Sequence, residues 1–344
     1  MSSDALSTAP HRHAAVVMTA MGEPTARIER RLAELVDQDA GVLSEVLVAC
    51  PPGDDSVRSA RRPRDARWEL RFVDNVGGAR SGGLNAAIWA ASADVICRVD
   101  ARSSIGPSHV GRCVGVLAGR PEVGIVGGAQ RPVAGGPGSA AAGIARALAN
   151  PYALGGAAYR HSGRDGPVDT VYLGAFRRHD VVALGGFDVR LAANEDFDLC
   201  ARYRQAGFVV LLDSSLTSTY EARTTLAGVA LQYHAFGRAK VRYWRTTGGR
   251  PNHRQGAALV LAGAGAAGMV WTLWRRPRLV GPVVAAAAVV GLAGDAMTGA
   301  PAEGARLAVR IAAVATYAGV WGGWLSGIAT EALARRVWPT HGTH

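Results

Sequence analysis

The sequence predicts an α/β domain with a mostly parallel, Rossmann-like sheet, followed by hydrophobic helices at a membrane. Up to about residue 235, short apolar runs alternate with helical patterns, as in sheets whose strands are joined by helices. Long apolar stretches follow in the C-terminal part. The chain has 344 residues, enough for two structural parts, and its formal net charge of +11 favours an anionic partner.

The first residues and the cysteines indicate a reducing compartment. The first apolar run, residues 14–20, is too short for a signal peptide or a membrane span. The cysteines are scattered without a CxxC pair, which favours buried thiols over a zinc site or a disulfide framework. We therefore expect the N-terminal domain to lie in the cytoplasm. The four cysteines are Cys50, Cys97, Cys113 and Cys200.

Apolar runs in the first hundred residues predict neighbouring strands of the sheet, and helical patterns connect them. The first helical pattern places Ile28, Leu32 and Leu35 on one face. Open parallel sheets bind ligands at the carboxyl ends of their strands, and Asp100 falls at such an end. The predicted strands span residues 15–19, 46–49, 70–73 and 94–100.

Another helix is predicted to begin after Asn194. Leu199 and Tyr203 repeat at helical spacing, and Gly207 is expected to end the helix. Asn194 is the expected N-cap, with acidic residues near the positive end of the helix dipole. The spacing alone leaves two interpretations, a well-capped helix or an acidic functional site. The acidic residues of this first turn are Glu195, Asp196 and Asp198.

The C-terminal part predicts attachment to a membrane. Six basic side chains lie between residues 238 and 254, and this segment favours a cytoplasmic N-terminal domain. The uncharged stretch 255–274 is long enough, at 1.5 Å per residue, to cross a hydrocarbon core of about 30 Å. Further apolar stretches span residues 279–294 and 311–330, and the alternative is a set of Ala/Gly-rich core helices. Two or three of these helices are expected to span or lie in the membrane.

Six short motifs carry a family resemblance. They are RSGGLN at 80–85, DAR at 100–102, VYLGAFR at 171–177, GGFD at 185–188, NEDFDL at 194–199 and QYHAFGR at 232–238. In this order and near this spacing, they resemble the family 2 glycosyltransferases with the GT-A fold, and within them the membrane-associated, succinoglycan-type exopolysaccharide enzymes. Each motif alone is weak, but the ordered set is specific. The resemblance covers roughly residues 14–245.

The resemblance implies three segments: a glycosyltransferase domain at 14–235, a basic juxtamembrane segment at 236–254 and a membrane region at 255–330. It implies an inverting enzyme of the cell membrane with a cytoplasmic catalytic domain. Such an enzyme moves a sugar from a nucleotide-sugar donor to a lipid-linked or cell-envelope glycan. No nucleic-acid motif occurs, so nucleic acid is not an expected partner.

The resemblance also assigns roles to individual residues. Asp196 would be the general base that takes the proton of the acceptor hydroxyl. Asp100 would bind a divalent metal, Mg²⁺ or Mn²⁺, which prefers carboxylate oxygen and would stabilise the leaving diphosphate. The expected donor-binding residues are Thr19, Glu23, Arg80, Asp100 and Arg102, and the expected acceptor-binding residues are Gly174, Glu195, Gln232 and Arg238.

Two departures from the family pattern keep an alternative open. Residues 49–52 read Ala-Cys-Pro-Pro where the family has an aspartate that recognises the nucleotide base, and Arg102 replaces the second acid of the metal motif. Arg102 would either bind the diphosphate directly or weaken metal binding. The alternative is a catalytically impaired membrane scaffold that binds a nucleotide or a partner enzyme. The retained pair Glu195 and Asp196 favours the enzyme. A dehydrogenase is disfavoured because no GxGxxG follows the first strand.

Overall fold

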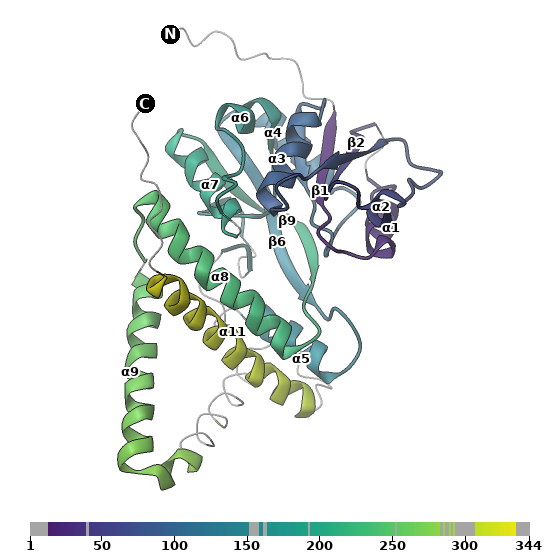
Figure 1. The fold of residues 1–344 in the computed structure, drawn as a ribbon. Coiled ribbons are helices and arrows are strands. Elements are labelled where there is room, and N and C mark those ends of the chain that lie inside the picture. Colours follow the sequence, from purple (N-terminus) through teal and green to yellow (C-terminus); the bar gives the residue numbers. More distant parts are fainter. Residues whose placement is uncertain are drawn as a thin grey trace. The chain divides into compact units, whose positions relative to one another are not determined.

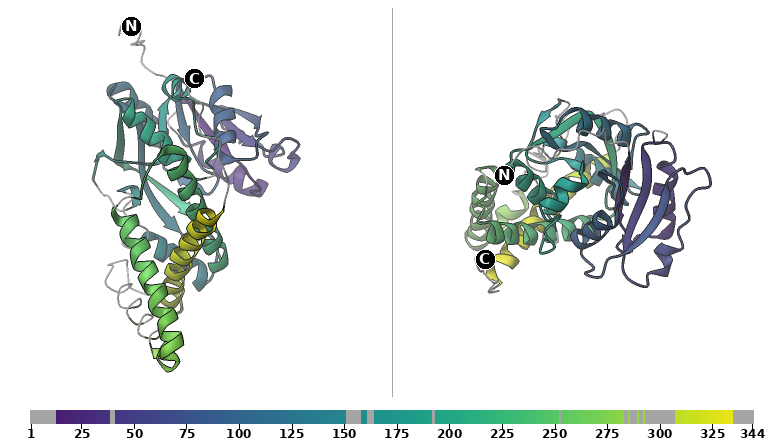
Figure 2. Two further views of the ribbon diagram at one scale, coloured as in Figure 1. Left: turned by 60° about the vertical axis from the view of Figure 1, so that its left-hand side comes forward. Right: turned by 90° about the horizontal axis from the view of Figure 1, so that it is seen from above.

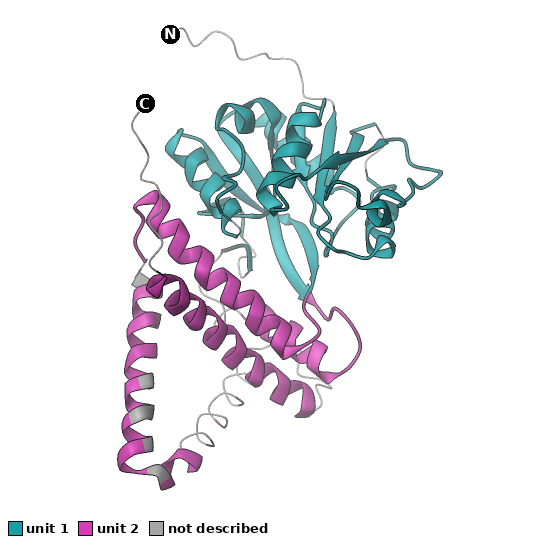
Figure 3. Ribbon diagram, viewed as in Figure 1, with its two compact units in different colours: residues 1–132, 156–221 teal, residues 133–155, 222–344 magenta. Residues whose placement is uncertain are grey.

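The structure is a computed structural model that divides into two compact units (Figure 3). Unit 1 comprises residues 1–132 and 156–221, and unit 2 comprises residues 133–155 and 222–344. The division after residue 221 lies upstream of the boundary expected at residue 235. The described residues are 13–38, 41–150, 158–160, 164–191, 193–251, 253–282, 285, 289, 292 and 307–334.

Unit 1 is built on a mixed sheet, which confirms the predicted α/β class (Figure 1). In the described residues the sheet has nine strands in the order β3-β2-β1-β4-β8-β6-β9-β5, and β7 pairs with β9. Pairing among β1 to β4 is parallel, whereas β8 is antiparallel to both β4 and β6. The strands are β1 (Ala14–Thr19), β2 (Leu43–Cys50), β3 (Glu69–Asp74), β4 (Val95–Arg98), β5 (Ser103–Ile105), β6 (Val123–Val133), β7 (Gly166–Pro167), β8 (Tyr172–Arg177) and β9 (Val209–Glu221).

Helices cover both faces of this sheet because alternate strand residues point to opposite sides. Val16 and Met18 of β1 join the apolar cluster that includes α1 and α4, whereas Val17 joins the cluster that includes α3, α6 and α7. The predicted face of α1 is buried, since Ile28 and Leu32 are fully covered. The helices of unit 1 are α1 (Thr25–Glu34), α2 (Asp55–Arg58), α3 (Arg80–Ala90), α4 (His109–Gly119), α6 (Arg178–Ala183) and α7 (Glu195–Gln205), with a 3-10 turn, η1, at Ala158–Arg160.

Unit 2 is helical. The helix α8 contains much of the basic segment, which is therefore helical up to residue 247. Helix α9 contains the predicted stretch 255–274, whereas most of the stretch 279–294 lies outside the described residues. The described elements are α5 (Ser139–Ala149), α8 (Leu226–Thr247), α9 (His253–Arg275), the 3-10 turn η2 (Pro277–Leu279) and α11 (Leu307–Leu333).

Helices α8 and α11 lie side by side and run parallel (Figures 1 and 2). A Cβ atom on Gly323 would lie 2.3 Å from the Ala230 carbonyl oxygen, and one on Gly327 would lie 2.0 Å from that of His234. Small residues that face backbone in this way let two helices approach closely. Because the contacts advance in the same direction along both helices, the two axes have the same sense.

Among the described residues, α11 is the one helix that is long and apolar enough to cross a membrane. It contains the predicted stretch 311–330. A single helix of this kind also occurs as the core helix of soluble proteins.

Candidate functional site

The predicted site lies where the strand order of unit 1 reverses: the chain runs from β1 to β2 and β3 on one side, and β4 lies on the other side of β1. Strand β4 is parallel to β1 on one side and antiparallel to β8 on the other. Asp100 follows the carboxyl end of β4, and Thr19 is the last residue of β1. Ligands of open α/β sheets bind outside the carboxyl ends of the strands at such a change of order.

Arg98, the last residue of β4, holds two of the predicted acids. Its Nε donates to Asp100 Oδ1 at 2.9 Å, and its Nη2 donates to Asp100 Oδ2 at 3.2 Å. The same Nη2 donates to Glu195 Oε1 at 3.3 Å. The guanidinium carbon also lies 5.9 Å from the ring centre of Phe187. One buried arginine therefore joins a residue expected on the donor side to one expected on the acceptor side.

Arg98 is not among the site residues that the sequence predicts. The available signal is a charged residue within the otherwise apolar run Val95-Ile96-Cys97-Arg98-Val99. A charge that is buried in a strand needs a partner, because an unpaired buried charge is costly. That signal marks Arg98 as part of a site, although it does not identify Glu195, which is 97 positions away.

The network shifts the pKa values of its two acids in opposite directions. Burial raises the pKa of Asp100, but the charges of Arg98 and Arg80 and the hydrogen bonds from Arg98 bring it below its ordinary value. For Glu195, burial is the largest effect and the charge of Asp196 adds to it. Its pKa is raised even though Arg98 and Arg80 oppose the change. Burial lowers the pKa of Arg98, but the surrounding carboxylates have the larger, opposite effect. The pKa of Arg98 is therefore raised above its ordinary value, and the side chain stays protonated.

Helix α7 presents the acidic cluster, and the backbone before it is unusual. The helix begins at Glu195 and ends at Gln205, with Gly207 in the left-handed region at φ +89°, as the sequence predicts. Asn194 occupies the predicted N-cap position, but it does not cap the helix in the expected way. Asn194 has φ +65°, and its side chain makes no capping hydrogen bond; its carbonyl accepts from the backbone N–H of Asp198.

Left-handed backbone at residues other than glycine is concentrated at this site. In the described part of the chain, the only such residues are Leu173, at φ 49°, and Asn194. Both lie in the site motifs, and Leu173 belongs to β8, the neighbour of β4. Strained backbone of this kind persists where the surrounding structure enforces it, and it is often found at functional sites. Asp196 itself is half-buried, and its Oδ1 accepts a hydrogen bond of 2.8 Å from the Phe197 backbone.

The predicted donor-binding residues all lie in unit 1. Thr19 is buried at the end of β1, and Glu23 accepts a hydrogen bond of 2.6 Å from the backbone N–H of Met21. Arg80 is exposed at the first position of α3, and its charge acts on both Asp100 and Glu195. Arg102 is half-buried four residues after Arg98.

The predicted acceptor-binding residues are divided between the units. Glu195 and Gly174 belong to unit 1, and a Cβ on Gly174 would lie 3.0 Å from Ile125 Cγ2, so core packing limits the size of residue 174. Gln232 and Arg238 belong to α8 of unit 2. Arg238 Nε donates to Glu331 Oε2 at 3.0 Å, which gives this arginine a structural partner within its own unit.

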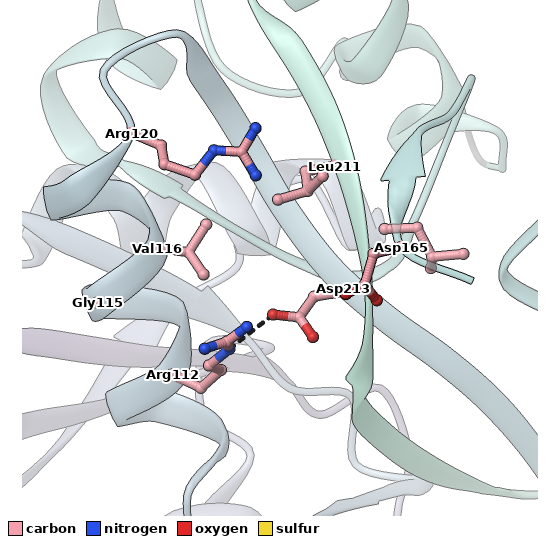
Figure 4. A pocket seen from close by; sticks show the side chains of 8 residues that line it. Arg112, Gly115, Val116, Arg120, Asp165, Leu211 and Asp213 are labelled. Carbon is pink, nitrogen blue, oxygen red and sulfur yellow. Dashed lines mark hydrogen bonds and ion pairs between the residues drawn. The ribbon is translucent and has the colours of Figure 1, made fainter. Parts of the chain in front are cut away.

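A cavity of 260 Å³ in unit 1 lies elsewhere, between α4 and β9 (Figure 4). Its charged groups have partners in the protein: Arg112 Nε donates to Asp213 at 2.7 Å, and Asp165 accepts from the Ser214 backbone at 2.6 Å. A shallower cavity of 560 Å³ lies along edge strand β3. Neither cavity is lined by a predicted site residue.

The described residues do not form a metal centre from protein side chains alone. Within them, no three His, Cys, Asp or Glu side chains gather as metal ligands would. Both carboxylate oxygens of Asp100 are bound by Arg98, and a basic residue, Arg102, stands where a second acid was expected. The metal-binding role of Asp100 therefore stays a prediction.

Comparisons with known proteins identify the fold. No protein-family model and no curated protein sequence matches the chain. A solved structure of the mannosyltransferase PcManGT from Pyrobaculum calidifontis, in complex with GDP-Man and Mn²⁺, has a TM-score of 0.54 and 18% identity over 94% of this chain and 88% of that chain. S. aureus TarS is more distant, with a TM-score of 0.45 and 12% identity over 68% of this chain and 40% of that chain. The first likeness shows that the chain has the fold of a solved glycosyltransferase structure; the second is too low to support an argument.

Proposed function

We propose that the chain is an inverting glycosyltransferase that moves a sugar from a nucleotide-sugar donor to a lipid-linked or cell-envelope glycan. The observation that carries the proposal is the position of Asp196. It stands in the first turn of α7, next to the carboxylates that Arg98 holds at the carboxyl edge of the sheet. The fold shared with a solved mannosyltransferase supports the same reaction class.

The arrangement suits a single displacement. The acceptor oxygen attacks the anomeric carbon while its proton passes to the carboxylate of Asp196. The bond between the anomeric carbon and the diphosphate oxygen breaks on the opposite side, so the configuration inverts. The leaving diphosphate is anionic, and Arg80 stands at the N-terminus of α3, where helix geometry favours phosphate. Arg102 is the second basic residue that we assign to the donor side.

Features of unit 2 support a membrane-bound acceptor. Helix α11 has the length and composition of a membrane span, and α9 exposes Trp271 and Trp274. Among the basic residues of α8, Arg245 is exposed and suits the negatively charged cytoplasmic surface of a membrane. We propose a cell-membrane protein with unit 1 in the cytoplasm and two or three helices that span or lie in the membrane.

A divalent metal at the leaving diphosphate is also part of the proposal. The mannosyltransferase of similar fold was solved with Mn²⁺. Mg²⁺ and Mn²⁺ sites at phosphates are often completed by substrate oxygens, so one protein carboxylate is sometimes sufficient. Here that carboxylate would be Asp100, and a bound metal would neutralise the diphosphate. An assay that compares Mn²⁺ or Mg²⁺ with EDTA decides the matter.

The first prediction concerns the base. Full-length protein in detergent is tested with a panel of nucleotide sugars and with membrane extract as the acceptor source. Asp196→Asn should lower turnover by about 10²–10⁴-fold, the usual contribution of a general base, while donor binding persists. Asp169→Asn is the matched control, because this acid of unit 1 is 79% exposed and pairs with Arg204 in the last turn of α7, at the opposite end of the helix from Asp196.

Two outcomes would contradict the proposal. Donor binding by the wild-type protein without turnover would favour the scaffold alternative. No binding of any nucleotide sugar would mean that the chain keeps the fold of a glycosyltransferase and not its function.

A further inference from the structure

Arg98 contacts an acid on each side of the candidate site. Its side chain is 7% exposed, and those of Asp100 and Glu195 are 19% and 4% exposed. We propose that Arg98 is a positioning residue: its guanidinium fixes the Asp100 carboxylate on the donor side relative to the Glu195 carboxylate on the acceptor side. This inference rests on the proposed function.

The geometry restricts Arg98 to this role. Two of its nitrogens, Nε and Nη2, engage Asp100 as a fork, and Nη2 is shared with Glu195. The buried ring of Phe187 lies beside the guanidinium. A lysine ammonium is a point donor on a flexible stem and cannot reproduce this planar fork. Arg98→Lys therefore keeps the charge and loses the fixed separation of the two carboxylates.

Arg98 also favours the charged form of Glu195, against the effect of burial. The charged groups that act on Glu195 are Arg98 from β4, Arg80 from α3 and Asp196 from its own helix, and Asp100 shares Arg98 with Glu195. Burial favours the protonated form of Glu195, and Arg98 is the largest opposing influence. Without Arg98, Glu195 would take up a proton at a higher pH. The acceptor would then meet a neutral acid in place of a carboxylate.

The test combines turnover with its pH dependence. Arg98→Lys should lower kcat/KM for the acceptor by about 10²-fold, the effect of a misplacement of about 1 Å in a reacting site. Arg98→Met should lower it further, and its loss should be larger at pH 6 than at pH 8.5. In the double variant Arg98→Met, Glu195→Gln, the loss should be the same at both pH values. Arg120→Met is the control, because Arg120 is exposed and pairs only locally with Glu122.

A second measurement does not depend on activity. At pH 8 the double variant should unfold at a higher temperature than Arg98→Met, because glutamine removes the buried charge of Glu195 that Arg98→Met leaves without its arginine. Equal unfolding temperatures, or an unchanged kcat/KM in Arg98→Lys, would overturn the inference. Wild-type protein without turnover would instead contradict the proposed function, and the unfolding comparison would still decide the role of Arg98.

Discussion

Each of the two units contains a buried network of arginine and carboxylate side chains. The number of arginines per carboxylate differs between the two networks. In unit 1, one arginine, Arg98, is shared by Asp100 and Glu195. In unit 2, two arginines share one acid: Arg238 Nε and Arg242 Nε lie 3.0 Å and 2.9 Å from the carboxylate of Glu331. Glu331 is 1% exposed on α11, and both arginines belong to α8.

The ratio of carboxylates to arginines distinguishes a functional site in unit 1 from a structural contact between two helices in unit 2. The unit 1 network has more acid than base and lies at the edge of the sheet, beside left-handed backbone and the half-buried Asp196. An excess of carboxylate suits a site that must accept a proton. The unit 2 network joins two helices that already approach closely through Gly323 and Gly327. There, one acid held by two guanidinium groups fixes the register of the helices.

The largest effect on stability is expected from Glu331→Gln. The change leaves Arg238 and Arg242 facing each other without the carboxylate, and removal of one partner from a buried ion pair typically costs about 3–5 kcal/mol. We expect the free energy of unfolding in detergent to fall by that amount. Tryptophan fluorescence is a suitable probe because most of the eight tryptophans lie in unit 2.

Glu331→Gln can also be tested by the pH dependence of its activity. Its pH–rate profile should keep the wild-type shape, because the unit 2 network is assigned no part in proton transfer. Thr330→Ala, at the exposed neighbouring position, is the control. Unchanged stability in Glu331→Gln would show that this network does not hold α11 to α8.

Two adjacent glycines test the close approach of the same helices. A Cβ on Gly323 would lie 2.3 Å from the Ala230 carbonyl oxygen, whereas one on Gly322 meets nothing within 4 Å. Gly323→Leu should therefore lower the free energy of unfolding by about 2–3 kcal/mol through overpacking. Gly322→Leu makes the same change in helix propensity and should not destabilise the helix pair. Equal effects at the two positions would contradict the packing between α8 and α11.

The sequence predicted those features that depend on residues close to one another along the chain. The buried face of α1 and the start of α7 follow from local periodicity, and both are confirmed. Arg98 was missed because its partner Glu195 is brought close only by the folded sheet. The assignment of residues 133–155 to unit 2 was also missed, since packing between α5 and α11 is a tertiary feature. The predicted capping hydrogen bond of Asn194 is absent because the residue adopts the left-handed conformation, which asparagine tolerates, in place of the extended backbone typical of an N-cap.

The smallest expected effect, and the one that depends most on pH, is that of Asp100→Asn. Asparagine keeps one acceptor for Arg98 but loses the charge, so the free energy of unfolding at pH 7 should fall by about 1 kcal/mol. The pKa of Asp100 is lowered from its ordinary value of 3.8. Its contribution is therefore fully present above that pH and is lost as the pH falls through the folded-state pKa. Denaturant unfolding at pH 7, 5 and 3 should show a constant difference from wild type at the first two values and a smaller one at the third.

Glu195→Gln should show the opposite sign within the same network. Because the pKa of Glu195 is raised, its ionisation costs the folded state free energy, and that cost appears as the pH rises through its folded-state pKa. The variant should then be at least as stable as wild type at pH 7, and exposed Asp169→Asn should differ little from wild type at any pH. If both network variants lost stability equally at every pH, Arg98 would hold the two acids as structural partners only. The contrast with the Glu331 network would then disappear.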